Sequence, residues 1–176
     1  MNWYFTFSVF FAIYFSFVKA AATPAVLPPS QDEFYTAPDN FESAKNGEIL
    51  RFRVAPAHVR SIYFTMNVKN AYQLLYRTTD SVGKPSYAAS ILLEPYNANN
   101  SRILQYSVAE DSSSVDCSVS YALIKGASMS PIITQAEVAL MQLGLNEGWW
   151  LHSSDYEGPD AAFTAGRMAA HANLDS

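Results

Sequence analysis

Acidic and hydroxyl side chains follow an apolar run in the middle of the sequence. The run consists of Ile103, Leu104, Tyr106 and Val108, and the residues at 110–114 are Glu, Asp and three serines. Strand-forming residues that end abruptly in turn-forming polar residues predict a buried strand that opens onto a loop. Sites in open α/β sheets are built where strands end. Asp111 is therefore a candidate site residue.

A second candidate centres on Ser128, within residues 126–130. Acyl hydrolases hold a serine on a sharp turn between strand and helix, with a histidine to take its proton and an acid to orient the histidine. Ser128, Asp155 and His171 would give the chain order serine, acid, histidine. However, a serine replaces the last glycine of the elbow pattern, and Pro131 lies where the helix should be under way. The pattern therefore argues against Ser128 as the nucleophile.

Asp155 and Glu157 follow a second apolar run and are open to two interpretations. They are two residues apart at a predicted strand end, so they are candidates for an acid/base pair. In the alternative, which the sequence favours, one caps the following helix and the other forms a salt bridge. The histidines His58, His152 and His171 lack the spacing of a zinc site, so no metal is predicted.

A helix is expected to connect the two apolar runs. Residues 134–145 open with the capping-box pattern Thr-Gln-Ala-Glu, and Val138, Met141 and Leu145 recur at helical spacing. Residues 147–154 form the second run. The order strand, helix, strand predicts a parallel crossover with the helix packed on the sheet.

Antiparallel strands are expected ahead of this crossover. Residues 72–78 and 87–93 are rich in strand formers, and the turn residues of 80–85 join them into a predicted hairpin. Residues 49–54 alternate and predict another strand. The expected fold class is therefore α/β, with a mixed sheet that is antiparallel at its first edge and parallel after Ile103.

An alanine-rich segment predicts a second crossover helix over residues 160–173, with Phe163, Ala170 and Leu174 near helical spacing. A crossover helix delivers a following parallel strand, and the sequence stops at Ser176 before one appears. The sequence therefore predicts an incomplete sheet with an unpaired, aggregation-prone edge.

Composition limits the possible partners. The chain is 49% hydrophobic, enough for one modest core, and its formal net charge of -5 comes without clustered Lys and Arg. Because phosphate binding needs such clusters, nucleic acid is not an expected partner.

The first residues predict secretion. Trp3 to Val18 is almost unbroken apolar sequence, and small residues and Pro24 follow it, as in a signal peptide cut after Ala20 or Ala22. A membrane anchor is the alternative, but the run falls short of the roughly 20 residues needed to span a bilayer.

Two further features matter in a secreted chain. Asn99, in a predicted polar loop, begins an Asn-Asn-Ser glycosylation pattern. Cys117 is the only cysteine, so it is either a reactive thiol or a residue without its partner.

Several segments together resemble the fungal secretory lipase family, the Candida-type secreted lipases. They are residues 70–81, residues 105–112, Cys117 with residues 120–122, residues 155–159, Ala162 with Phe163, Gly166, and Leu174 with Asp175. These segments lie between about Pro29 and the end of the chain, in the order and spacing typical of that family.

The resemblance implies an α/β-hydrolase that hydrolyses triacylglycerols and related lipid esters at a lipid–water interface outside the cell. It implies a serine-based acyl-enzyme and no cofactor. Asp111 would match the oxyanion-loop residue, a contribution of roughly 2.7 to 4 kcal/mol in the transition state. Cys117 would pair with a cysteine far downstream. The family's catalytic serine, in a Gly-Tyr-Ser-Gly-Gly-like elbow, and its Asp and His partners match no position here.

The expected organisation is a signal peptide over residues 1–22, an N-terminal extension over 23–65, and the amino-terminal half of an α/β-hydrolase domain over 66–176. The expected function is that of a secreted triacylglycerol lipase truncated before its catalytic triad. The alternatives are an inactive remnant that serves as a binding or structural domain, and a truncated gene model.

Overall fold

Five strands form one mixed sheet in the part of the chain that this computed structural model describes, residues 26–110, 112–127, 132–163 and 165–176. The strands are β1 (Ile49–Val54), β2 (Asn70–Thr79), β3 (Pro85–Glu94), β4 (Asn99–Gln105) and β5 (Trp149–Ser154), in the spatial order β1-β2-β3-β5-β4. The α-helices are α1 (Val119–Ala122), α2 (Ile132–Asn146) and α3 (Gly166–Asp175). Short 3-10 turns cover Pro29–Gln31, Glu33–Tyr35, Phe41–Ser43 and Val115–Cys117. The predicted mixed α/β sheet is confirmed.

The predicted hairpin is β2 and β3, which pair antiparallel from Asn70 opposite Glu94 to Thr79 opposite Pro85. Their turn is held by the Asp80 carboxylate, which accepts hydrogen bonds from the backbone N–H groups of Val82 (2.9 Å) and Lys84 (2.8 Å). The predicted first strand is β1, which pairs antiparallel with β2.

The predicted parallel crossover is β4, α2 and β5. Leu151 of β5 lies opposite Leu104 of β4 in a parallel pair and opposite Leu93 of β3 in an antiparallel pair. The sheet therefore changes from antiparallel to parallel at β5. On α2, Val138, Met141 and Leu145 are fully buried in the main core, as their spacing predicts.

The expected burial of the strand at residues 103–108 is wrong. β4 begins and ends earlier, and most of its residues are exposed; the side chain of Ile103 is 65% exposed. The physical reason is that β4 lies at the end of the strand order and pairs only with β5 among the described residues. Val108, beyond the strand, does enter the core. Asn99 is also displaced from its expected loop, since it is the first residue of β4.

The second predicted helix exists as α3, but its packing face differs from the expected one. Met168 and Ala172 are its buried residues, whereas Phe163 precedes the helix and is exposed, as is Leu174. Ala172 packs with Tyr76 and Ala88 of the sheet, and the Tyr76 hydroxyl donates to the Ala172 carbonyl at 2.8 Å. An alanine-rich sequence has few large side chains, so its periodicity identifies the buried face poorly.

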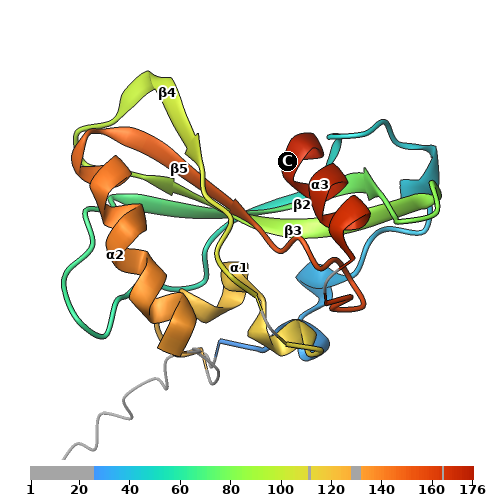
Figure 1. The fold of residues 1–176 in the computed structure, drawn as a ribbon, viewed down its shortest axis with the longest axis horizontal. Helices are drawn as coiled ribbons and strands as arrows, with labels where there is room; N and C mark the ends of the chain where they lie inside the picture. Colours follow the sequence, from blue (N-terminus) through green and yellow to red (C-terminus); the bar gives the residue numbers. More distant parts are fainter. Residues whose placement is uncertain (1–25, 111, 128–131, 164) are drawn as a thin grey trace, which may run out of the picture.

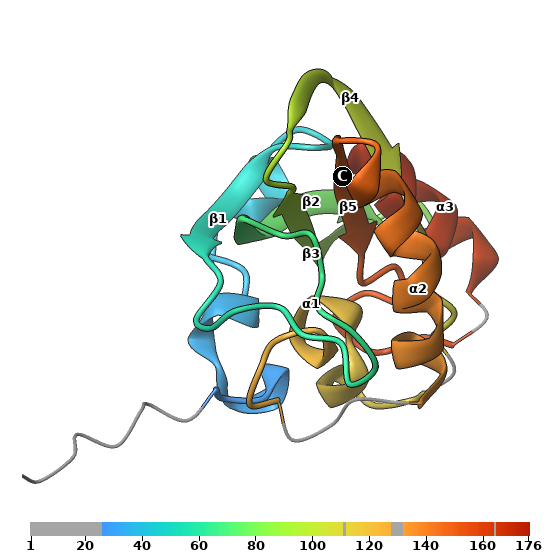
Figure 2. The ribbon, with the colours of Figure 1, turned by 90° about the vertical axis from the view of Figure 1, so that its left-hand side faces the viewer.

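Helices cover both faces of the sheet. In Figure 1, α1 and α2 lie on one face and α3 lies on the other, towards the opposite end of the sheet. Figure 2 shows β1 and β4 at the two margins. Within the described ranges, no helix combines the length and the apolar character needed to cross a membrane. The predicted signal peptide, residues 1–22, lies outside those ranges.

Candidate functional site

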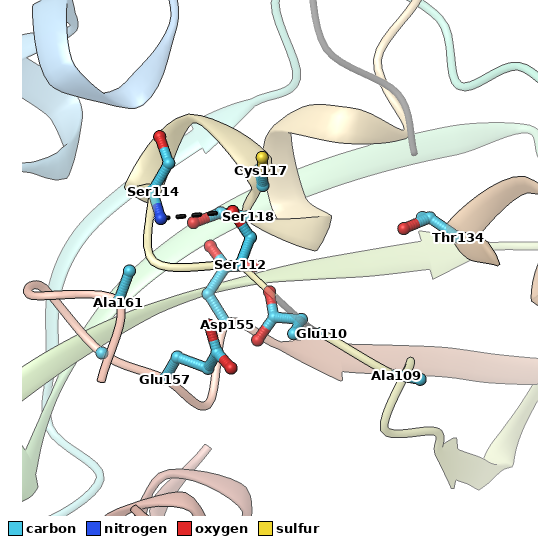
Figure 3. Close-up of a pocket in the computed structure, with 11 residues that line it drawn as sticks. Ala109, Glu110, Ser112, Ser114, Cys117, Ser118, Thr134, Asp155, Glu157 and Ala161 are labelled. Carbon is cyan, nitrogen blue, oxygen red and sulfur yellow. Dashed lines mark hydrogen bonds between the residues drawn. The ribbon is translucent and has the colours of Figure 1, made fainter. Parts of the chain in front are cut away.

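The loops that follow β4 and β5 meet at a small cavity. Its volume is about 60 Å³, and its lining residues come from the loop after β4, the start of α2 and the loop after β5 (Figure 3). They are Ala109, Glu110, Ser112, Ser114, Cys117, Ser118, Thr134, Asp155, Glu157, Gly158 and Ala161. The carboxyl ends of the two parallel strands therefore build a joint site, as open α/β sheets generally do.

Three carboxyl groups face this cavity, from Glu110, Asp155 and Glu157 (Figure 3). Burial, together with the neighbouring charges of Asp155 and Glu157, raises the pKa of Glu110 to about 9. Burial also raises the pKa of Asp155 to about 7, against the hydrogen bonds from Ser120. Like charges in a buried space disfavour simultaneous ionisation, so the group of acids retains at least one proton near neutral pH.

Two of these acids hold the beginning of α1. Ser120 donates to Asp155 through both its backbone N–H (2.8 Å) and its hydroxyl (2.5 Å). The backbone N–H of Val119 donates to Glu110 at 3.2 Å. Because the first N–H groups of a helix lack partners within it, these carboxyl groups satisfy donors that would otherwise be buried and unpaired.

The loop after β4 is fixed on both sides of position 111. The backbone N–H of Ala109 donates to the Glu137 carboxylate on α2 at 2.8 Å, and that of Glu110 donates to the Tyr156 hydroxyl at 2.9 Å. Further along, Asp116 accepts hydrogen bonds from the backbone N–H and the hydroxyl of Ser30, at 2.8 and 2.9 Å. The neighbouring segments thus hold the loop in place.

A partly buried hydrogen-bond network extends from this site to the N-terminal turns. The Tyr35 hydroxyl lies 3.0 Å from the Ser120 hydroxyl, and the Gln73 amide donates to both Tyr35 (2.9 Å) and the Ser120 carbonyl (2.7 Å). Arg53 donates to Gln73 at 2.7 Å and forms a salt bridge with Asp32 at 2.6 Å. The network ties residues around Asp32 to Asp155.

Comparison with known proteins identifies the scaffold. The chain is 43% identical over 167 residues to Lipase 1 of Candida albicans, and 40% identical over 166 residues to Lipase A of Arthroderma benhamiae. These alignments cover 94% and 91% of the chain. Residues 123–176 match the model of a family described as secretory lipase. The chain is therefore similar to secretory lipases over most of its length.

The fold agrees with this similarity to secretory lipases. The crystal structure of Candida antarctica lipase A superimposes with a TM-score of 0.72 and 28% identity, over 86% of this chain and 35% of that one. The fold is therefore of the α/β-hydrolase type. The chain spans about a third of the length of the relatives it matches, 36% of Lipase 1 and 35% of Lipase A.

The structure places only some of the candidate site residues that the sequence predicts. Asp111 and Ser128 both lie outside the described residues. His171 is half-buried on α3 and does not line the cavity that contains Asp155. The expected helix cap after β5 is wrong: Ala165 occupies the N-cap of α3, while Asp155 binds Ser120. An acid/base role for Asp155 and Glu157 stays the interpretation that the sequence favours less.

The other polar candidates lie apart from the acids or make structural contacts. His58 is exposed, whereas His152 is buried in β5, where its Nδ1 contacts the Gln105 side chain and burial lowers its pKa to about 4. Cys117 lines the cavity as a free thiol. Asn99 is exposed, and its side-chain oxygen accepts from the Ser101 hydroxyl at 2.7 Å. No group of three potential metal ligands occurs among the described residues.

Sequence analysis missed Glu110 and Ser120 as parts of this site. Glu110 belongs to the turn-forming run and to the segment 105–112 that resembles the lipase family, but it was not named as a site residue; its position directly before Asp111 is the signal that could have found it. Ser120 gives no comparable signal, because its partner Asp155 is 35 residues away.

Proposed function

We propose that this chain forms the oxyanion-loop part of a secreted lipase that hydrolyses lipid esters through a serine-based acyl-enzyme. The observation that carries the proposal is the anchored loop around position 111, at the ends of β4 and β5. The names of its relatives, Lipase 1 and Lipase A, support the reaction class.

The proposed role follows from the chemistry of acyl transfer. Attack of a serine on the ester carbonyl places negative charge on the carbonyl oxygen, and a histidine takes the serine proton. A fixed N–H donor at that oxygen stabilises the transition state by roughly 2.7 to 4 kcal/mol. In our proposal the loop at Asp111 supplies one such donor, and the nucleophile and base come from outside the described residues.

The alternative function is a secreted binding or structural domain without catalysis. One observation favours it: among the described residues, no serine is brought together with a histidine and an acid. Ser120 binds Asp155 but is completely buried, and His152 contacts Gln105 instead.

A chimera tests the proposal. The matching part of Candida albicans Lipase 1 would be replaced by residues 29–176 of this chain, and fatty-acid release from a triacylglycerol emulsion would be measured. The chimera is expected to be active. Asp111→Pro, which removes the backbone N–H, is expected to lower kcat by about 10²- to 10³-fold. Ser113→Pro, which places proline in the same loop, is the matched control and should retain activity within about tenfold.

The outcomes separate the two functions. A folded but inactive chimera would overturn the lipase proposal and favour the binding domain. An active chimera that is unaffected by Asp111→Pro would retain the reaction and reject the oxyanion role. Ser128→Ala should leave the chimera active, whereas loss of its activity would make Ser128 the nucleophile and contradict our assignment.

A further inference from the structure

A second and larger cavity lies away from the acids, between the β1–β2 connection and the segment after α1. Backbone hydrogen bonds fix its walls: Ala55 N–H donates to Ala71 (2.9 Å) and Lys125 N–H donates to His58 (2.8 Å). Val59 and Ile124 add an antiparallel bridge. In Figure 2 the β1–β2 connection runs across the front of α1. The resulting groove has a volume of about 770 Å³, within the usual range for small-molecule sites.

The lining of this groove is aliphatic with a basic rim. Val26, Ala57, Val59 and Val68 contribute apolar surface, and Lys69 and Lys125 contribute positive charge. Among the described residues no acidic side chain lines it, although the chain has 16 acids against 11 Lys and Arg. An apolar cavity with only cations at its rim is complementary to an amphiphile that has an aliphatic tail and an anionic head.

The two lysines differ in whether their charge is already paired with an acid. Lys69 forms a salt bridge with Glu94 at 3.2 Å, which already neutralises much of its charge. Lys125 is exposed and forms no ion pair within the described ranges. An incoming anion would therefore meet an uncompensated charge at Lys125.

We propose that this groove binds a free fatty acid, with its carboxylate at Lys125 and its chain along the valine-lined wall. The proposal rests on the proposed function, because a fatty acid is the product of lipid ester hydrolysis. A concave site also suits one detached chain better than a bilayer surface, which would require a projecting face. The groove would hold the released product away from the cavity at the ends of β4 and β5.

Calorimetric titration of the purified chain with decanoate, below its micelle concentration, tests this directly. Butyrate lacks the long tail and decyltrimethylammonium reverses the head charge, so both should bind at least about tenfold more weakly. Lys125→Glu should weaken decanoate binding by about tenfold, as reversal of one exposed charge contact allows. Lys84→Glu, at the exposed tip of the β2–β3 hairpin, is the matched control and should change the Kd by less than about twofold.

Each result has a distinct meaning. Absence of decanoate binding, equal binding of the cationic amphiphile, or equal effects of the two lysine variants would overturn the proposal. Binding to anionic phospholipid vesicles without binding to monomeric decanoate would assign the surface to membranes and would also overturn it. Because the readout is binding, an active chimera with no decanoate site rejects only this inference, while decanoate binding with an inactive chimera rejects only the lipase function.

Discussion

Ser120 donates two hydrogen bonds to the Asp155 carboxylate, one from its backbone N–H at 2.8 Å and one from its hydroxyl at 2.5 Å. Both residues are buried, and 35 positions separate them in the chain. The pair joins the end of β5 to the first turn of α1. Because α1 directly follows the loop after β4, the pair also anchors that loop. An acid in this position is part of the support for the candidate site, whatever reaction takes place there.

Removing the hydroxyl should therefore destabilise the protein. Ser120→Ala leaves one Asp155 oxygen buried without its donor, and we expect the free energy of unfolding to fall by about 1–3 kcal/mol. Urea unfolding followed by circular dichroism measures the change. Ser43→Ala removes an exposed hydroxyl that donates to Asn40 and should change stability by less than about 0.5 kcal/mol. Equal midpoints for Ser120→Ala and the unmodified chain would refute the role of this bond.

Stability should decrease as the pH rises through the neutral range. Burial raises the pKa of Glu110 to about 9 and that of Asp155 to about 7, so the folded state holds protons that the unfolded chain has released. Their stabilising contribution is complete below the ordinary carboxyl pKa near 4 and is lost as the pH rises towards 9.

Glu110→Gln tests this pH dependence, since it keeps an acceptor for the Val119 N–H but does not titrate. Urea unfolding at pH 5, 7 and 9 should show a shallower decline for Glu110→Gln, with a gain over the unmodified chain of more than about 1 kcal/mol at pH 9. Glu42→Gln, at an exposed position, should follow the unmodified chain. If the stability of Glu110→Gln declined with pH as steeply as that of the unmodified chain, Glu110 would not be the cause of the pH dependence.

Gly148 connects α2 to β5 in a conformation that favours glycine. Its φ is +78°, and a Cβ there would lie 2.5 Å from the Asn97 carbonyl oxygen. We expect Gly148→Ala to cost about 2 kcal/mol or more, because the left-handed backbone and the contact both penalise a side chain. Gly166→Ala is the control, since a Cβ there meets nothing within 4 Å; it should be neutral or slightly stabilising in thermal unfolding.

Arg53 attaches the N-terminal turns to the sheet. Its guanidinium lies 4.1 Å from the centre of the Phe34 ring and 2.6 Å from the Asp32 carboxylate, and it also donates to Gln73. Lysine cannot make these contacts together, so Arg53→Lys should cost about 1–3 kcal/mol and speed proteolysis near residue 34. The Arg102 guanidinium lies 5.8 Å from the centre of the Trp149 ring, so Arg102→Lys should lower the stability less than Arg53→Lys does. An unchanged rate of proteolysis near residue 34 in Arg53→Lys would contradict the anchoring role of Arg53.

The sequence predicted those elements whose signals are local. The hairpin of β2 and β3 has a turn sequence at 80–85, and α2 has Val138, Met141 and Leu145 on one face, so each could be read from adjacent residues. The exposure of Ile103 could not be predicted from adjacent residues, because this exposure depends on the place of β4 in the strand order. Strand order is set by contacts between residues distant in the sequence.

The residues of the candidate site also divide into those that local sequence signals predict and those that depend on contacts between distant segments. Glu110 and Asp155 stand at the ends of predicted strands, so their convergence follows from the parallel crossover. Ser120 belongs to a helix of only four residues, too short for a periodic pattern, and its bond to Asp155 exists only in the folded chain. The network from Tyr35 to Ser120 spans 85 positions and was equally invisible to sequence patterns.

The separation between Ser120 and Asp155 also bears on how the protein is made. The ribosome synthesises α1 before the end of β5, so the first amide groups of the nascent α1 have no Asp155 carboxylate to bind until 35 further residues have been added. The turn that supports the loop after β4 therefore gains its full set of bonds only after the whole crossover has emerged from the exit tunnel.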